Sequence, residues 1–387
     1  MVLPLYDLSR KEQPELKKMG NAGLWFDRFF NGYLRKKEKK TSDQKLVISE
    51  DDRSEWLNDL VTTINPRKDK TDKESVEERN QILEKKALRQ MNLVKSLHGS
   101  VQIYTSEWHF VTGMGLPHPI ENGFLWHPTL GVPYFPGAAI KGMVRSYLEV
   151  WHNKDERLKA RLLKWFGSDD KEPLKQESQS QSGCLIFFDA LPMSSVKLGI
   201  DIMTPHMGDW YAKGNQIQNI QGESEKIPAD WHDPVPIKYL VAEKAQFLFS
   251  IAPRKKSDAI EVKEAMNVLD SSLKWIGAGA KTAIGYGFFS DDEEATKKIR
   301  NKQEEAVLKN LPPHERIPKE IEKMDVAMLP DLLGKNKNKT LKSWGADQDF
   351  YLKAIKDVFG DLIKKWEHSE KANERKVYRL IYPEKIH

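Results

Sequence analysis

Residues 273–289, which read LKWIGAGAKTAIGYGFF, decide the fold of this chain. Ahead of the first glycine, apolar residues recur at helical spacing, and Gly277 suits the end of a helix because it adopts a left-handed backbone at little cost. Beyond the loop, Ile284, Tyr286 and Phe288 alternate with small residues, which is typical of one face of a strand. The stretch therefore predicts a helix, a glycine-rich loop and a strand in succession.

The glycine-rich loop is expected to bind phosphate. Gly277 and Gly279 have no side chains, so a large ligand can approach the backbone, where N–H groups meet phosphate oxygens while Lys281 adds a positive charge. A Walker loop needs a glycine directly before the Lys-Thr pair, where this chain has Ala280, and it opens a helix. A dinucleotide-binding fingerprint also leads from strand into helix. The pattern favours a polymeric phosphate ligand over ATP or NAD, and a tight turn without a ligand is the alternative.

A second motif occupies residues 123–145, which read GFLWHPTLGVPYFPGAAIKGMVR. The Pro-Gly pair introduces apolar residues at helical spacing, which predicts a helix from about residue 138. Lys141 and Arg145 are four residues apart and share the face opposite the apolar stripe. Cations are poorly placed near a helix N-terminus, so we expect an anion to bind there. A solvated pair of basic residues is the alternative.

The two motifs together carry a family resemblance. PYFPGxxxKGxxR followed by GxGAKTxxGYG resembles the RAMP superfamily of CRISPR-Cas proteins. Segments at 21–27, 116–123, 203–206 and 234–237 are similar to the family of sixth RAMP subunits of the type III-B (Cmr) effector complex. The resemblance covers residues 20–34 and 101–290. Family members often carry serines where this chain has Ala138 and Ala139, which would leave backbone amides and Lys141 to contact phosphate.

The resemblance implies an RNA-binding subunit in antiviral defence, and the lack of a closely spaced His/Asp/Glu set and of an aspartate in the loop at 113–123 favours a non-catalytic one. It would hold guide RNA (crRNA) toward its 3′ end, contribute to target RNA engagement, and contact the backbone and terminal RAMP subunits and the small helical subunit. Such contacts position RNA without reading its sequence. We expect RNA contacts at Gly137, Ala138, Ala139, Lys141, Arg145, Gly277, Gly279, Ala280, Lys281, Thr282 and Tyr286. Further candidates for contacts to RNA or within a thumb are His118, Trp126, His127, His206, Met207, Trp210 and Tyr211.

The order of predicted elements in residues 101–290 indicates an α+β, ferredoxin-like (RRM-like) RAMP domain. Strands are expected at 101–112, 183–190, 196–202 and 237–251, with a last strand ending at 289. Helices are expected from 138, at 155–166 and before Gly277. The insertion at 204–236 separates the expected strands at 196–202 and 237–251. When it is set aside, the elements follow a β-α-β-β-α-β order, and the resemblance implies the same fold.

Two further regions flank this domain. Residues 1–100 read as an aromatic arm, a mobile linker at 35–49 and a helical addition with helices at 48–64 and 73–97. Residues 291–387 form a charge-rich helical C-terminal extension, in which 350–366 carry one amphipathic stripe and 377–381 a short strand or helix turn. Packing onto the chain's own domain and docking of a partner subunit are both open for these regions.

The insertion at 204–236 is interpreted as a thumb that reaches over RNA. Met207, Trp210 and Tyr211 lie together near its start, and glycines and prolines limit regular structure later on. Loops of this length in compact domains are usually functional or disordered. RAMP subunits commonly use a β-hairpin thumb, so the resemblance favours function. A loop that lies back on its own sheet is the alternative.

Composition limits the compartment and the binding mode. The chain has 387 residues with 39% hydrophobic content, enough for one or two cores, and a net charge of only +5, so any nucleic-acid face must be local. The single cysteine, Cys184, has no partner for an intrachain disulfide. We find no signal peptide and no run of 18 apolar residues. These features predict a soluble, cytoplasmic protein without membrane contact.

An enzymatic function is the runner-up. A metal-independent endoribonuclease acting on guide or target RNA could use a histidine as general base, with Lys281 stabilising the pentacoordinate phosphate. Candidate bases are His109, His118, His127, His206 and His232. No closely spaced set suits a metal, so neither metal nor cofactor is expected. In the loop at 113–123, where the resemblance places a catalytic aspartate in target-cleaving subunits, this chain offers Glu121 only; Asp189 is expected to cap or end a strand.

Overall fold

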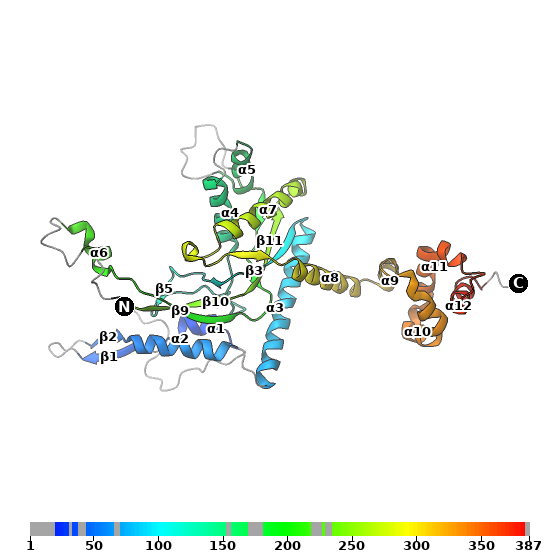
Figure 1. The fold of residues 1–387 in the computed structure, drawn as a ribbon, viewed down its shortest axis with the longest axis horizontal. Helices are drawn as coiled ribbons and strands as arrows, with labels where there is room; N and C mark the ends of the chain where they lie inside the picture. Colours follow the sequence, from blue (N-terminus) through cyan, green and yellow to red (C-terminus); the bar gives the residue numbers. More distant parts are fainter. Residues whose placement is uncertain are drawn as a thin grey trace. The chain divides into compact units, whose positions relative to one another are not determined.

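The computed structural model describes residues 20–30, 33–37, 44–65, 70–151, 156–168, 181–217, 227–228 and 234–383. The chain forms two compact units, residues 1–296 and 297–387 (Figure 1). Each unit has a hydrophobic core of its own. Among the described helices, none combines the length and the apolar character needed to cross a bilayer.

The first unit is organised around an antiparallel sheet with the order β12-β3-β11-β7, in which β8 also pairs with β11. Helices α4 and α7 contact each other and this sheet. The bounds are β3 (Ser100–Ser106), α4 (Gly137–Trp151), α5 (Glu156–Phe166), β7 (Leu185–Phe187), β8 (Leu191–Pro192), β11 (Gln246–Pro253), α7 (Ala259–Trp275) and β12 (Phe289–Asp291). Residues predicted to form a helix before the glycine-rich loop therefore do so.

Alternation along β11 shows how both faces of the sheet are covered. Phe247 and Phe249 are fully buried in the core that α4 and α7 share. Ser250 points to the opposite face, because successive strand residues alternate, and its hydroxyl lies 3.2 Å from Gln90 Nε2 of α3 (Lys70–Ser96). The sheet is therefore enclosed between the α4/α7 layer and α3.

Two predicted long strands are each divided between two sheets, so their prediction as continuous strands was wrong. β3 is followed by β4 (His109–Phe110), and β10 (Ile237–Glu243) precedes β11. β4 and β10 form a second sheet with β9 (Lys197–Met203), in the order β4-β10-β9. At the division, Ser106 N–H donates to Ala245 O at 3.0 Å, and Ala245 N–H donates to Ser106 Oγ at 3.0 Å. This junction places β4 beside the glycine-rich loop.

The N-terminal helices share the core of the first unit. They are α1 (Ala22–Arg28), which lies in the predicted aromatic arm, and α2 (Glu50–Ile64), which lies close to its predicted bounds. Helix α3 also lies close to its predicted bounds and packs against β11. The rings of Trp25 and Trp56 stack at 3.5 Å, and both belong to the same buried cluster as Phe110. The predicted linker at 35–49 is corrected, because β1 (Tyr33–Lys37) and β2 (Gln44–Ile48) form an antiparallel hairpin there.

The insertion at 204–236 joins β9 to β10, and Met203 and Ile237 are paired at its base. It begins with α6 (Gly208–Lys213) and a 3-10 turn at Gly214–Gln216. Of the predicted thumb, residues 218–226 and 229–233 lie outside the described residues. A short hairpin of β5 (Pro117–His118) and β6 (Glu121–Asn122) lies in the loop at 113–123.

The second unit is helical, as predicted for the C-terminal extension. Ile317, Leu333, Ile355 and Val377 are fully buried in its core, whereas Phe350 of the predicted stripe is 45% exposed. Residues 377–381 belong to a helix. The helices are α8 (Glu293–Lys309), which begins in the first unit, α9 (Pro313–Glu322), a π-helical segment at Pro330–Lys335, α10 (Lys337–Trp344), α11 (Gln348–Lys364) and α12 (Ala372–Ile381).

Candidate nucleic-acid interface

The glycine-rich loop packs tightly onto the chain's own backbone. Ala280 N–H donates to Val111 O at 2.8 Å, and Gly287 N–H donates to His109 O at 2.8 Å. A Cβ atom on Gly279, whose φ is +83°, would lie 2.1 Å from the Val111 carbonyl oxygen. The glycine is therefore required for close packing against the segment after β4, which corrects the expectation that it leaves room for a ligand.

The segment after the loop is a turn where a strand was predicted. Thr282–Ile284 form a 3-10 turn, and β12 begins only at Phe289. Lys281 precedes the turn with a φ of +61°, in the left-handed region. The prediction that Tyr286 lies on a strand was wrong, because it occupies the turn that follows.

Lys281 belongs to a polar and aromatic group that the sequence did not reveal. Its Nζ lies 5.0 Å from the centroid of the Tyr239 ring, and the Tyr239 hydroxyl is 3.3 Å from that of Tyr286. The Tyr286 hydroxyl donates to Asp201 Oδ2, and His109 Nδ1 lies 3.7 Å from the same oxygen. We call Trp108, His109, Asp201, Tyr239, Lys281 and Tyr286 the Trp108 cluster.

Strand pairing assembles the Trp108 cluster. Tyr239 of β10 and Asp201 of β9 are direct cross-strand partners, and His109 of β4 pairs with Glu243 of β10. Each of these residues is carried by a different strand, so their proximity depends on register. Isolated motifs could not have found them, although the Trp-His pair at 108–109 inside a strand-like segment was a signal.

The electrostatics of the cluster fix two protonation states. Burial opposes ionisation of Asp201, but hydrogen bonds from Tyr286 and from the Ile202 N–H, together with nearby His109 and Lys281, outweigh it and lower the pKa of Asp201. Burial and the Asp201 hydrogen bond raise the pKa of Tyr286. At neutral pH the carboxylate is charged and the phenol is neutral. Tyr286 is only 2% exposed, which corrects its prediction as an RNA contact.

The start of α4 is already supplied with an anion. Gly137 N–H donates to Asp189 Oδ1 at 2.7 Å, so the chain's own carboxylate occupies the place predicted for phosphate. Asp189 therefore caps a helix from another segment. A Cβ on Gly137 would lie 2.2 Å from the Phe187 carbonyl oxygen, which is a second reason for glycine here. Ala138 and Ala139 are exposed beside it.

The two predicted cations of α4 have partners within the chain. Lys141 Nζ donates to Phe166 O at 3.1 Å, at the end of α5, where a cation complements the helix dipole. Arg145 Nε donates to Glu149 Oε1 at 2.6 Å. Both residues are half-buried. Both cations therefore have a structural role, in holding a helix end and a helix face.

Two of the predicted ligand residues pack against Phe26 of α1. His118 Nε2 lies 2.9 Å from Phe26 O, and its Nδ1 accepts from the Ile120 N–H at 3.3 Å. Burial lowers the pKa of His118, although the Phe26 hydrogen bond opposes this. Trp126 is 5% exposed and packs against Phe26. Burial of Trp126 corrects its prediction as an RNA contact, whereas His118 is half-buried.

The remaining candidate residues are at least partly accessible to solvent. Burial lowers the pKa of His127, which is half-buried beside Tyr134. His206 and Tyr211 are exposed in the insertion, and Trp210 is partly exposed near them. Among the described residues, no group of three or more His, Cys, Asp or Glu could hold a metal ion.

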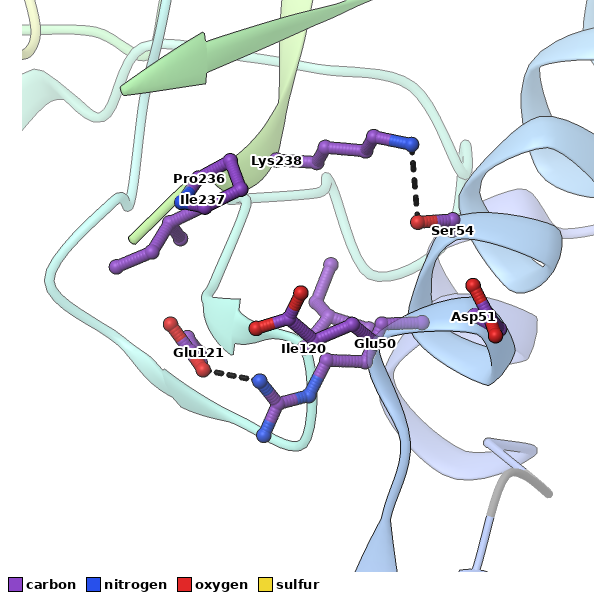
Figure 2. Close-up of a pocket in the computed structure, with 9 residues that line it drawn as sticks. Glu50, Asp51, Ser54, Ile120, Glu121, Pro236, Ile237 and Lys238 are labelled. Carbon is purple, nitrogen blue, oxygen red and sulfur yellow. Dashed lines mark hydrogen bonds and ion pairs between the residues drawn. The ribbon is translucent and has the colours of Figure 1, made fainter. Parts of the chain in front are cut away.

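The loop at 113–123 contributes to a pocket of about 190 Å³ between α2 and the start of β10 (Figure 2). Glu121 forms an ion pair with Arg53 of α2, and Lys238 Nζ donates to Ser54 Oγ at 3.0 Å. The carboxylate at the position considered for catalysis is thus neutralised by Arg53. Glu50 also lines this pocket.

Comparisons with known proteins agree on one family. Residues 104–290 match the RAMP superfamily model. The CRISPR system Cmr subunit Cmr6 of Pyrococcus furiosus is 27% identical over 244 residues, which cover 51% of this chain and 69% of that protein. The CRISPR system CMR subunit Cmr6 of Saccharolobus solfataricus is 25% identical over 171 residues, covering 44% and 48%.

Solved structures give a weaker likeness. A type III-B Cmr-beta structure bound to cognate target RNA is 20% identical and covers 65% of this chain and 82% of its own, with a TM-score of 0.38. The crystal structure of Cmr6 from Pyrococcus furiosus is 26% identical and covers 50% and 98%, with a TM-score of 0.30. Because both scores are below 0.5, the assignment rests on the sequence relationships.

The family match runs from β3 to β12 and so includes both motifs that carried the resemblance. The curated relatives point to the same subunit of the type III-B system. Residues 104–290 of this α+β chain match the RAMP superfamily, and the chain is homologous to the Cmr6 subunit of the type III-B Cmr CRISPR system.

Proposed function

We propose that this chain is a non-catalytic RNA-binding subunit of a type III-B CRISPR effector complex. It holds guide RNA toward its 3′ end and contributes to target RNA engagement, together with the other RAMP subunits and the small helical subunit, in the cytoplasm. Homology to Cmr6 subunits supports this role. The proposal also includes the thumb, since Trp210 and Tyr211 are 39% and 77% exposed near the start of the insertion.

The proposed domain is ferredoxin-like. The strands β3, β7, β11 and β12 are first to fourth in the chain, and the sheet order is fourth, first, third, second with antiparallel pairing throughout. Helices α4 and α7 follow the first and third of these strands. This is the arrangement expected for a β-α-β-β-α-β unit, and it places the glycine-rich loop directly before the last strand.

The proposal of RNA binding rests mainly on the surroundings of the Lys281 ammonium group. Lys141 and Arg145 have partners in the chain, whereas Lys281 makes no ion pair and no side-chain hydrogen bond within the part of the chain that the structure describes. Its Nζ lies over the face of Tyr239, and its charge is close enough to Asp201 to help lower the pKa of that carboxyl group. A half-buried ammonium held in this way can bind a phosphate without first breaking another ion pair.

The test is the salt dependence of RNA binding. Lys281→Ala should weaken binding of unrelated single-stranded RNAs about equally and reduce the slope of log K against log salt by roughly 0.7, the value for one phosphate contact on a single strand. Lys263→Ala, which removes an exposed lysine from α7, is the matched control and should leave the slope unchanged. An unaltered slope and affinity in Lys281→Ala would reject the role of this loop.

The endoribonuclease alternative now has one specific observation in its favour. His109, the carboxylate of Asp201 and the cation Lys281 are assembled in the Trp108 cluster, and a general base and a phosphate-stabilising cation are what metal-independent cleavage requires. The non-catalytic proposal expects purified chain to leave guide and target RNA intact in a chelator. Specific cleavage that disappears in His109→Ala would replace it with the enzyme.

A further inference from the structure

Trp108 is a large aromatic side chain held at the surface. It lies in the turn between β3 and β4, where the chain passes from one sheet to the other, and it is 49% exposed. Its ring stacks on that of His109, with centroids 4.7 Å apart and an interplanar angle of 23°. His109 therefore covers one face of the indole.

The position of Tyr286 shows that it does not cover the second face. Its ring centroid lies 5.0 Å from Trp108 and 5.4 Å from His109, and its plane is nearly perpendicular to both. A ring on the far face of Trp108 would be roughly twice the stacking distance from His109. Tyr286 instead flanks the stacked pair and does not stack on the second face of the indole, whose side chain is 49% exposed.

We propose that the second face of Trp108 stacks a nucleobase of single-stranded RNA whose backbone passes Lys281. This inference deepens the proposed function and rests on it. Every nucleobase has a π face, so such a contact tolerates any sequence, and it requires a base that is not already stacked in a duplex. The Trp108 ring is linked to Lys281 through Tyr286 and Tyr239, so a stacking surface and a cation occur in one rigid group.

The surroundings of Trp108 favour RNA over an apolar protein partner. An exposed tryptophan at a protein interface is typically enclosed by apolar contacts that exclude water. Here the ring is bordered by a histidine and a tyrosine, with an ionised aspartate and the Lys281 ammonium group beyond them. Alternating aromatic and cationic groups are the usual composition of single-strand binding surfaces.

The experiment compares RNA with a backbone that lacks bases. Filter binding measures the affinity of the full chain for a short single-stranded RNA and for an abasic oligonucleotide of equal length and charge. Trp108→Ala should bind the RNA roughly 5- to 150-fold more weakly, the range expected for one stacked base, and should bind the abasic strand as wild type does. Trp108→Phe should recover most of the loss. Trp151→Ala, a change at an equally exposed tryptophan of α4, is the control and should bind normally.

A second measurement reports stacking directly. RNA containing 2-aminopurine should lose fluorescence on binding wild type and Trp108→Phe, and lose less on binding Trp108→Ala. Should Trp108→Ala bind RNA as wild type does while Lys281→Ala is weakened, the stacking inference is overturned and the proposed function stands. If wild type binds neither strand, both are overturned. Equal weakening of Trp108→Ala toward both strands would also reject stacking, because a base contact cannot affect an abasic ligand.

Discussion

Replacing Gly279 by alanine tests whether the glycine-rich loop is shaped by its own packing or by a ligand. The new methyl group would meet the Val111 carbonyl oxygen at 2.1 Å and Phe110 Cε2 at 2.9 Å, so the backbone must shift. Gly285 is the matched control: its φ of +99° is also unfavourable for alanine, but nothing lies within 4 Å of the added Cβ.

Comparing the two variants separates the cost of backbone strain from the cost of lost packing. Placing alanine in the left-handed region costs roughly 1–2 kcal/mol in both. Only Gly279→Ala also loses the hydrogen bond from Ala280 N–H to Val111 O, about 0.5–1.5 kcal/mol, and overpacks the contact, about 1–3 kcal/mol. We therefore expect Gly279→Ala to be about 1.5–4.5 kcal/mol less stable than Gly285→Ala, from these two effects combined.

Urea unfolding followed by tryptophan fluorescence measures the difference. All tryptophans except Trp344 and Trp366 lie before residue 297, so the signal reports chiefly on the first unit. The midpoint of Gly279→Ala should fall well below that of Gly285→Ala with a similar slope. If the two variants unfold alike, the loop is not pressed onto Val111, and room for a ligand would again explain the glycine.

Three further predictions concern the residues that the structure reassigned. Lys141→Ala should lower the unfolding free energy by about 0.5–1.5 kcal/mol through the lost bond to Phe166 O, and leave RNA affinity unchanged; weaker RNA binding with normal stability would contradict its structural role. Asp189→Ala should cost about 0.5–2 kcal/mol as a lost helix cap, and Asp189→Asn less, because the amide oxygen still accepts from Gly137; equal stability of Asp189→Ala and wild type would refute this. The pKa of His118 is lower in the folded chain than in the unfolded chain. As the pH falls below about 6.5, the unfolded chain therefore binds the proton first, and the free energy of unfolding decreases. The melting temperature of His118→Asn should therefore depend less on pH between about 7.5 and 5 than that of wild type, and an identical dependence would show that His118 is not the group involved.

Much of the fold followed from local pattern. The helix before Gly277, the helix after Pro136 and the helices α2 and α3 were predicted because apolar spacing and helix-ending residues act over a few positions. The division of the two long strands was not predicted, since residues 101–112 remain strand-like throughout while the sheet partner changes at Ser106. Which strand a segment pairs with depends on tertiary packing, and the spacing of apolar residues does not reveal it.

The candidate site was predicted only in part, for the same reason. Lys281 was identified from its motif, but Lys141 and Gly137, identified from the second motif, are engaged by Phe166 and Asp189. A sequence shows which residues can bind an anion and does not show that another segment supplies one. The Trp108 cluster depends on the register between β9 and β10, where a shift by one residue would turn Asp201 to the other face.

The closed base of the insertion makes it a natural site for grafting. Met203 and Ile237 are paired across β9 and β10, so the two ends of the insertion are about 5 Å apart and a two-residue turn could join them. Doubling the length of such a loop adds only about 0.6 kcal/mol of closure entropy. Foreign segments, such as an affinity tag or a reporter domain, could be exchanged here, and lineages could vary this length freely while the neighbouring Asp201 and Tyr239 keep their alignment.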